Sequence, residues 1–112
     1  MHIDFGFLLS NAPGKGIHLE KGAHFKLTSE HVEVLGGIKS KKYREYRELM
    51  RLGFMALQEH ADKIIKLVEM MFLSQRDLPC FIQGESLIKD LKERILPGGR
   101  VMNEIEAARH ID

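Results

Sequence analysis

Residues 2–14 read HIDFGFLLSNAPG, and they divide the chain into two different kinds of sequence. Residues 1–5 are apolar enough for the end of a β-strand. In residues 6–27, glycine, proline, serine and asparagine interrupt any regular spacing of apolar residues. Asp4 therefore stands where a strand runs into a long loop, beside the permissive backbone of Gly6. A carboxylate in that place suits a metal ligand, although an aspartate that only forms a turn fits it too.

The pattern changes to helical spacing after the loop. Thr28 and Ser40 are candidate N-caps, and Gly36 and the Pro97-Gly98-Gly99 run are candidate ends of helices. A short helix is expected between Thr28 and Gly36. Longer helices are expected at about 40–58, 61–74, 85–96 and 101–111.

The apolar residues of these helices recur on one face of each, which predicts a packed helical core. In the second helix the stripe is Tyr43, Tyr46, Met50, Gly53 and Leu57. Residues expected to face the core are Ile64, Ile65, Val68, Met71 and Phe72, then Leu87, Ile88, Leu91 and Ile95, with Met50, Met55, Met70 and Met71 as fillers of the core. Residues expected to point outward are Lys89, Asp90, Lys92, Glu93 and Arg94.

Composition limits the classes of protein to which the chain could belong. With 112 residues it is one domain at most, and with 44% hydrophobic residues and a net charge of +1 it is neither disordered nor a polybasic nucleic-acid binder. Cys80 is the one cysteine, which excludes an internal disulfide and fits a reducing compartment; we expect it to be buried in packing. No apolar run approaches the ~18 residues of a membrane span, so any contact with membrane is expected to be peripheral.

Several blocks in a consistent order resemble the phosphatidylinositol 3-/4-kinase family, most of all the beta-like type III phosphatidylinositol 4-kinases. Beyond residues 2–14, the blocks are FKLTSEHVEVLGG (25–37), the stretch 43–60 with GFMALQEH, IIKLVEMM (64–71), LPCF (78–81) and LIKDLKERI (87–95). The resemblance covers about residues 2–96, and Asp4-Phe5-Gly6 is its D-F-G corner, which holds magnesium in kinases.

The resemblance implies a mainly α fold, a loop followed by a helical bundle, within the C-terminal lobe of a protein-kinase-like (α+β) lipid kinase domain. Residues 1–5 would be a strand end with D-F-G, 6–27 the activation segment, 28–96 the helical core and 97–112 a C-terminal helix. The phosphate loop, phosphate lysine and catalytic loop precede D-F-G in this family. The chain is therefore expected to be a fragment that is inactive alone.

The resemblance also assigns roles at the D-F-G corner, with ATP and Mg²⁺ as cofactors. Asp4 would hold the magnesium that bridges the phosphates of ATP. Ile3 would pack under the adenine ring, or else belong to ordinary strand core. Phe5 would dock into the lobe and orient Asp4, and Gly6 completes the motif.

The activation segment of lipid kinases faces the inositol head group. Lys15, Lys21 and Lys26 against Glu20 give residues 7–27 a net charge of +2, which suits an anionic lipid. Lys15 and Lys21 are assigned to substrate contact and Lys26 more to anchoring the segment, whereas the alternative is a solvated loop. This sparse charge favours plain phosphatidylinositol. The richer basic run at residues 39–47 fits either anionic membrane or a solvated helix start.

The expected function is therefore transfer of the γ-phosphate of ATP to the 4-hydroxyl of phosphatidylinositol, by the protein of which this chain is a part. Expected partners are phosphatidylinositol in membranes and regulatory proteins, but no nucleic acid. The expected location is cytoplasmic, peripheral on the cytosolic face of Golgi or endosomal membranes. The alternative is a non-catalytic helical interaction module, or a truncated product without kinase activity.

Overall fold

The computed structural model describes residues 8, 9, 11, 25 and 27–111. This part of the chain contains the α-helices α1 (Ser29–Val34), α2 (Lys41–Glu59), α3 (Ala61–Ser74), α4 (Ser86–Ile95) and α5 (Glu104–Ile111), and the 3₁₀ turns η1 (Pro79–Phe81) and η2 (Pro97–Gly99). The predicted mainly α fold is confirmed. The predicted strand end at residues 1–5 lies outside the described residues.

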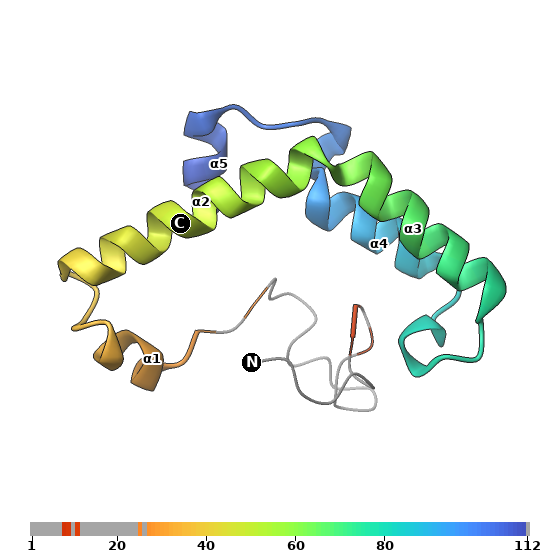
Figure 1. Ribbon diagram of the computed structural model, residues 1–112, viewed down its shortest axis with the longest axis horizontal. Helices are drawn as coiled ribbons and strands as arrows, with labels where there is room; N and C mark the ends of the chain where they lie inside the picture. The colour runs from red at the N-terminus through yellow and green to blue at the C-terminus, as the bar shows by residue number, and fades with distance from the viewer. Residues whose placement is uncertain (1–7, 10, 12–24, 26, 112) are drawn as a thin grey trace.

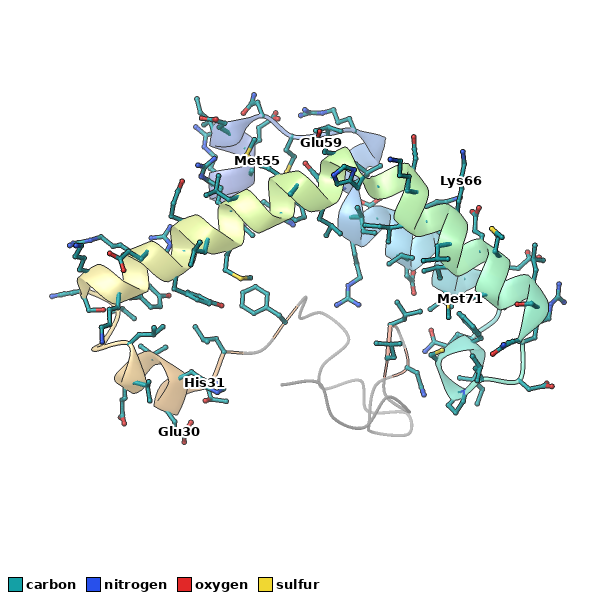
Figure 2. All side chains as sticks on the ribbon, viewed as in Figure 1. Glu30, His31, Met55, Glu59, Lys66 and Met71 are labelled. Carbon is teal, nitrogen blue, oxygen red and sulfur yellow. The ribbon has the colours of Figure 1, made fainter. Side chains whose placement is uncertain are left out.

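Local sequence explains where the first two helices begin. The hydroxyl of Thr28 accepts a hydrogen bond from the backbone N–H of His31 on α1, and that of Ser40 accepts one from the N–H of Tyr43 on α2. Both serve as the N-caps that the sequence predicts. The pKa of Glu30, on the exposed first turn of α1 (Figure 2), is lowered by its backbone N–H and then by Thr28.

Helices α2 and α3 meet end to end and form an arch, as Figure 1 shows, with α4 beside α3 and α5 against α2. One cluster of buried side chains joins α3, η1 and α4, and its members are Phe72, Cys80, Phe81 and Leu87. A second cluster lies where α3 begins and α4 ends, and its members are Ala61, Ile65 and Ile95. Cys80 is therefore buried in packing, as expected.

Some side chains on the outer sides of the arch are more exposed to solvent than the sequence predicts. Met70 is 67% exposed and Met71, labelled on α3 in Figure 2, is 44% exposed, so their assignment to the core is wrong. Met50 and Met55 are half-buried. On α2 the residues Phe54 and Gln58, rather than Gly53 and Leu57, face the neighbouring helices, because α5 packs on that side.

Gln58 ties three segments together at the top of the arch. Its side-chain nitrogen donates to the carbonyl oxygen of Ile95 at 2.9 Å, and its side-chain oxygen accepts from the backbone N–H of Met102 at 2.9 Å. Gln58 is only 2% exposed, so both ends of the amide are buried and satisfied. These two hydrogen bonds hold the end of α4, and the irregular segment that leads to α5, against α2.

Candidate functional site

The residues to which the sequence assigns chemistry fall in the first part of the chain. Those at the D-F-G corner are Ile3, Asp4, Phe5 and Gly6, and those of the activation segment are Lys15, Lys21 and Lys26. All seven lie outside the described residues. Their roles stay predictions, and the described residues show only what this part of the chain leads into.

The turn after the D-F-G corner is held against the helical core. Leu9 packs on the cluster of α3, η1 and α4, and Arg94 of α4 donates a hydrogen bond to its carbonyl oxygen at 3.5 Å. Leu9 has a φ of 60°, a left-handed conformation that is unusual for leucine, and Asn11 closes the turn with a bond to Leu8. Arg94, expected to point only outward, therefore contributes to anchoring this turn.

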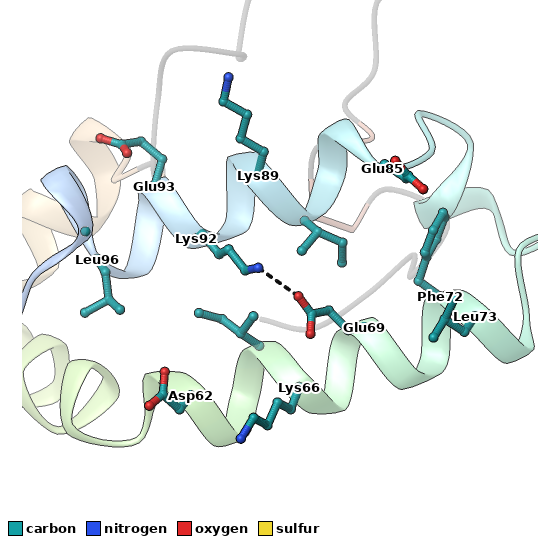
Figure 3. A pocket seen from close by; sticks show the side chains of 13 residues that line it. Asp62, Lys66, Glu69, Phe72, Leu73, Glu85, Lys89, Lys92, Glu93 and Leu96 are labelled. Carbon is teal, nitrogen blue, oxygen red and sulfur yellow. Dashed lines mark ion pairs between the residues drawn. The ribbon is translucent and has the colours of Figure 1, made fainter.

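A groove of about 890 Å³ runs between α3 and α4. Its floor is apolar, and its rim carries four carboxylates and three lysines, including the ion pair of Lys92 with Glu69 at 2.8 Å (Figure 3). The lining residues are Asp62, Ile65, Lys66, Glu69, Phe72, Leu73, Glu85, Ile88, Lys89, Lys92, Glu93, Leu96 and Gly99. The four carboxylates and three lysines give the rim a net charge of −1, so the groove has no excess of positive charge that would favour a nucleoside triphosphate.

A smaller hollow of about 180 Å³ lies between α2 and α5, beside three arginines. Arg51 is paired with Glu48, and this contact raises the pKa of Arg51 and lowers that of Glu48. The other lining residues are Arg44, Arg47, Ala108 and Ile111. The hollow is below the roughly 300 Å³ typical of sites for small ligands.

Metal ligands do not gather within the described ranges. No group of three or more histidine, cysteine, aspartate or glutamate side chains there is arranged to hold a metal ion. None of the helices described is both long and apolar enough to cross a bilayer. The predicted magnesium ligand Asp4 belongs to the part of the chain that is not described, so its assignment rests on the motif.

The start of α5 carries a charged network that the sequence reading missed. Asn103 and Glu106 exchange hydrogen bonds between side chain and backbone at 2.9 and 3.0 Å, and Arg100 grips the Glu106 carboxylate at 2.6 and 2.9 Å. The spacing N-x-x-E before a helix is the signal that would have found this capping box. Arg100 and then the Asn103 backbone lower the pKa of Glu106 to about 2, and Arg100 has a raised pKa.

Acid should weaken this cap. The pKa of Glu106 is about 2 in the fold against 4.5 ordinarily, so its stabilising effect is complete above pH 4.5 and is lost as the pH falls from 4.5 toward 2. We expect the free energy of unfolding to fall more steeply across this window in the native chain than in Glu106→Gln. Denaturation by urea at a series of pH values measures it, with the exposed Glu59→Gln as control. If the free energy of unfolding fell equally with pH in all three proteins, the assigned cap would be contradicted.

Comparison with known proteins finds relatives among the phosphatidylinositol 4-kinases. The chain is 45% identical over 94 residues to phosphatidylinositol 4-kinase beta of Xenopus tropicalis, and equally to those of Rattus norvegicus and Mus musculus. The match covers 84% of this chain and 11% of each relative, so the chain spans about a tenth of the length of these kinases. No family model matches the chain, and no solved structure does.

The sequence identity extends through the helical blocks that resemble the kinase family. It is therefore much stronger evidence than the Asp4-Phe5-Gly6 triplet alone. Four-fifths of the chain aligns as one stretch, at an identity that indicates common descent. The resemblance to the beta-like type III phosphatidylinositol 4-kinases is therefore confirmed, and this chain is similar over most of its length to one segment of phosphatidylinositol 4-kinase beta.

Proposed function

We propose that this chain is part of the catalytic domain of a phosphatidylinositol 4-kinase, an enzyme that transfers the γ-phosphate of ATP to the 4-hydroxyl of phosphatidylinositol. The observation that carries the proposal is the 45% identity to phosphatidylinositol 4-kinase beta over 94 residues. The blocks that resemble the kinase family form α1 to α4, so the matched sequence makes up the helical core.

The proposal gives the D-F-G corner the chemistry. Asp4 holds Mg²⁺ on the phosphates of ATP, Phe5 and Gly6 set its orientation, and Ile3 packs under the adenine. Leu9 lies five residues after Asp4 in the sequence and packs on the cluster of α3, η1 and α4, so this turn is the first described part of the chain after the motif. Bound magnesium supplies charge that neutralises the transferring phosphate.

The activation segment would select the lipid. Lys15 and Lys21 face the inositol head group and its phosphodiester, whereas Lys26 anchors the segment next to α1. A phosphodiester carries one negative charge, so two lysines suffice to pair with it, and a head group with further phosphates would need a denser basic cluster. Peripheral contact with a membrane follows from the substrate, and location at the cytosolic face of a Golgi or endosomal membrane is a further part of the proposal.

A non-catalytic helical interaction module is the second candidate. The exposed apolar residues on α3, such as Leu67 (59%) and Met70 (67%), favour it, because they would be covered by a protein partner. Both candidates predict a folded helical core. They differ in whether the full-length protein that carries this segment phosphorylates a lipid.

An assay with radiolabelled ATP and vesicles of phosphatidylinositol separates the two candidates. The full-length protein should yield phosphatidylinositol 4-phosphate in the presence of Mg²⁺. The 112-residue polypeptide should yield none, because phosphoryl transfer also needs a phosphate loop, a phosphate lysine and a catalytic loop. Full-length protein that is folded and binds ATP, but forms no labelled lipid, would favour the interaction module.

A further inference from the structure

The turn between α1 and α2 presents apolar and basic side chains side by side. Val34 is 81% exposed and Ile38 is 64% exposed, and the lysines and arginine that follow are exposed as well. We call this the elbow surface, and its residues are Val34, Ile38, Lys39, Lys41, Lys42 and Arg44. Figure 1 places the turn at one end of the long axis of the molecule.

Hydrogen bonds hold this turn in one shape. The hydroxyl of Ser40 donates to the carbonyl oxygen of Leu35 at 2.6 Å while it caps α2 through the N–H of Tyr43 at 3.0 Å. The N–H of Gly37 closes α1 on the carbonyl of Val32 at 2.9 Å, with Gly37 at a φ of 88° that favours glycine. The exposed side chains therefore project from a turn whose backbone is fixed by hydrogen bonds.

The charge of this end is strongly positive. Residues 39–47 carry three lysines and two arginines against Glu45, a net charge of +4, although the whole chain carries only +1. Lys41 contacts Glu45 at 3.6 Å, but both side chains are more than half exposed, so the pair neutralises little. The first turn of α2 contains no acidic residue, and cations there oppose the helix dipole. An external anionic surface would relieve this repulsion.

We propose that the elbow surface docks on an anionic lipid bilayer. The basic residues would lie among the lipid head groups, and Val34 and Ile38 would enter the boundary between head groups and acyl chains. A bilayer satisfies both features at once, since it offers a wide negative surface with an apolar layer beneath it. An acidic polypeptide without an apolar surface would pair with the charges but would leave the two apolar tips uncovered.

The inference is separate from catalysis. It concerns how the protein meets a membrane, and its test measures binding to vesicles without turnover. If the elbow surface did not bind vesicles, the proposed kinase activity would be unaffected. Equally, a protein with no kinase activity could still dock by this surface.

The test compares sedimentation of the chain with vesicles of phosphatidylcholine and phosphatidylserine against vesicles of phosphatidylcholine alone. The chain should partition onto the anionic vesicles and not onto the neutral ones, and salt should release it. Replacing Lys41, Lys42 and Arg44 together by glutamine should lower the partition coefficient about 100-fold, because each basic residue near such a surface is worth about 5-fold. The matched control replaces three exposed lysines elsewhere, Lys63, Lys66 and Lys89, by glutamine and should bind almost as the native chain does.

A second pair of variants tests the apolar tips. Ile38→Asp should weaken binding about 10-fold or more, whereas Ile82→Asp, at a site 76% exposed near η1, should change it little. Circular dichroism verifies that every variant retains its helices. The proposal is overturned if the chain does not bind anionic vesicles, if the two triple variants bind alike, or if soluble polyglutamate binds as tightly as the vesicles do.

Discussion

Replacing Asp4 by asparagine should lower the phosphatidylinositol 4-kinase rate of the full-length protein by at least about 100-fold. The carboxylate would supply negative charge to a magnesium that stabilises the transferring phosphate, and an amide of the same shape cannot supply that charge. Raising the magnesium concentration should recover little of the rate. The measurement is radiolabelled phosphate transfer at saturating ATP, together with a thermal melt, which should be almost unchanged.

The control for this substitution is Asp77→Asn, which makes the same change at an exposed position between α3 and η1. It should keep the native rate. If the Asp4→Asn protein also kept a near-native rate at saturating magnesium, Asp4 would not be the metal ligand. The H-I-D-F-G stretch would then be a structural turn.

Replacing Gln58 by methionine should destabilise the chain by about 2–5 kcal/mol. Methionine fills a similar volume, but it leaves the buried carbonyl of Ile95 and the part-buried N–H of Met102 without the partners that Gln58 gives them at 2.9 Å each. Such a loss is a large part of the total stability of a small domain. Urea denaturation followed by circular dichroism measures it.

The matched control is Gln75→Met, the same substitution at an exposed glutamine that ends α3. It should stay within about 0.5 kcal/mol of the native chain. Equal midpoints for the two variants would show that the amide of Gln58 does not hold α2, α4 and α5 together.

The helices were predictable because their signals are local. Ser40 and Thr28 mark the starts of α2 and α1, and the predicted range 61–74 is the range observed for α3. Pro97 and the glycines after it end α4, with Gly98 at a φ of 68° that favours glycine. Caps, glycines and helical spacing need only a few neighbouring residues, and these are visible in the sequence.

What could not be predicted depends on residues that are distant along the chain. Gln58 bonds to Ile95 and Met102, and Arg94 bonds to Leu9, and no short motif announces such pairs. Met71 fits the core-facing spacing of α3, yet no described element covers it. Periodicity finds a stripe, but the packing of neighbouring helices decides how much of it is buried.

For the candidate site too, some features could be predicted from the sequence and others needed the structure. The assignment of Asp4 and of the three lysines came from motif and resemblance, and they lie outside the described residues, so it stays a prediction. The comparison with phosphatidylinositol 4-kinase beta supports the family of the motif but names no residue. The basic run at residues 39–47 was visible in the sequence, whereas its place beside two exposed apolar side chains needed the structure.

A chimeric enzyme tests the central claim most directly. The matching segment of mouse phosphatidylinositol 4-kinase beta is replaced by the aligned 94 residues of this chain, and formation of phosphatidylinositol 4-phosphate is measured with radiolabelled ATP. If this chain is a working segment of such a kinase, the chimera should keep lipid kinase activity. A chimera that folds and binds ATP but makes no phosphatidylinositol 4-phosphate would contradict the claim.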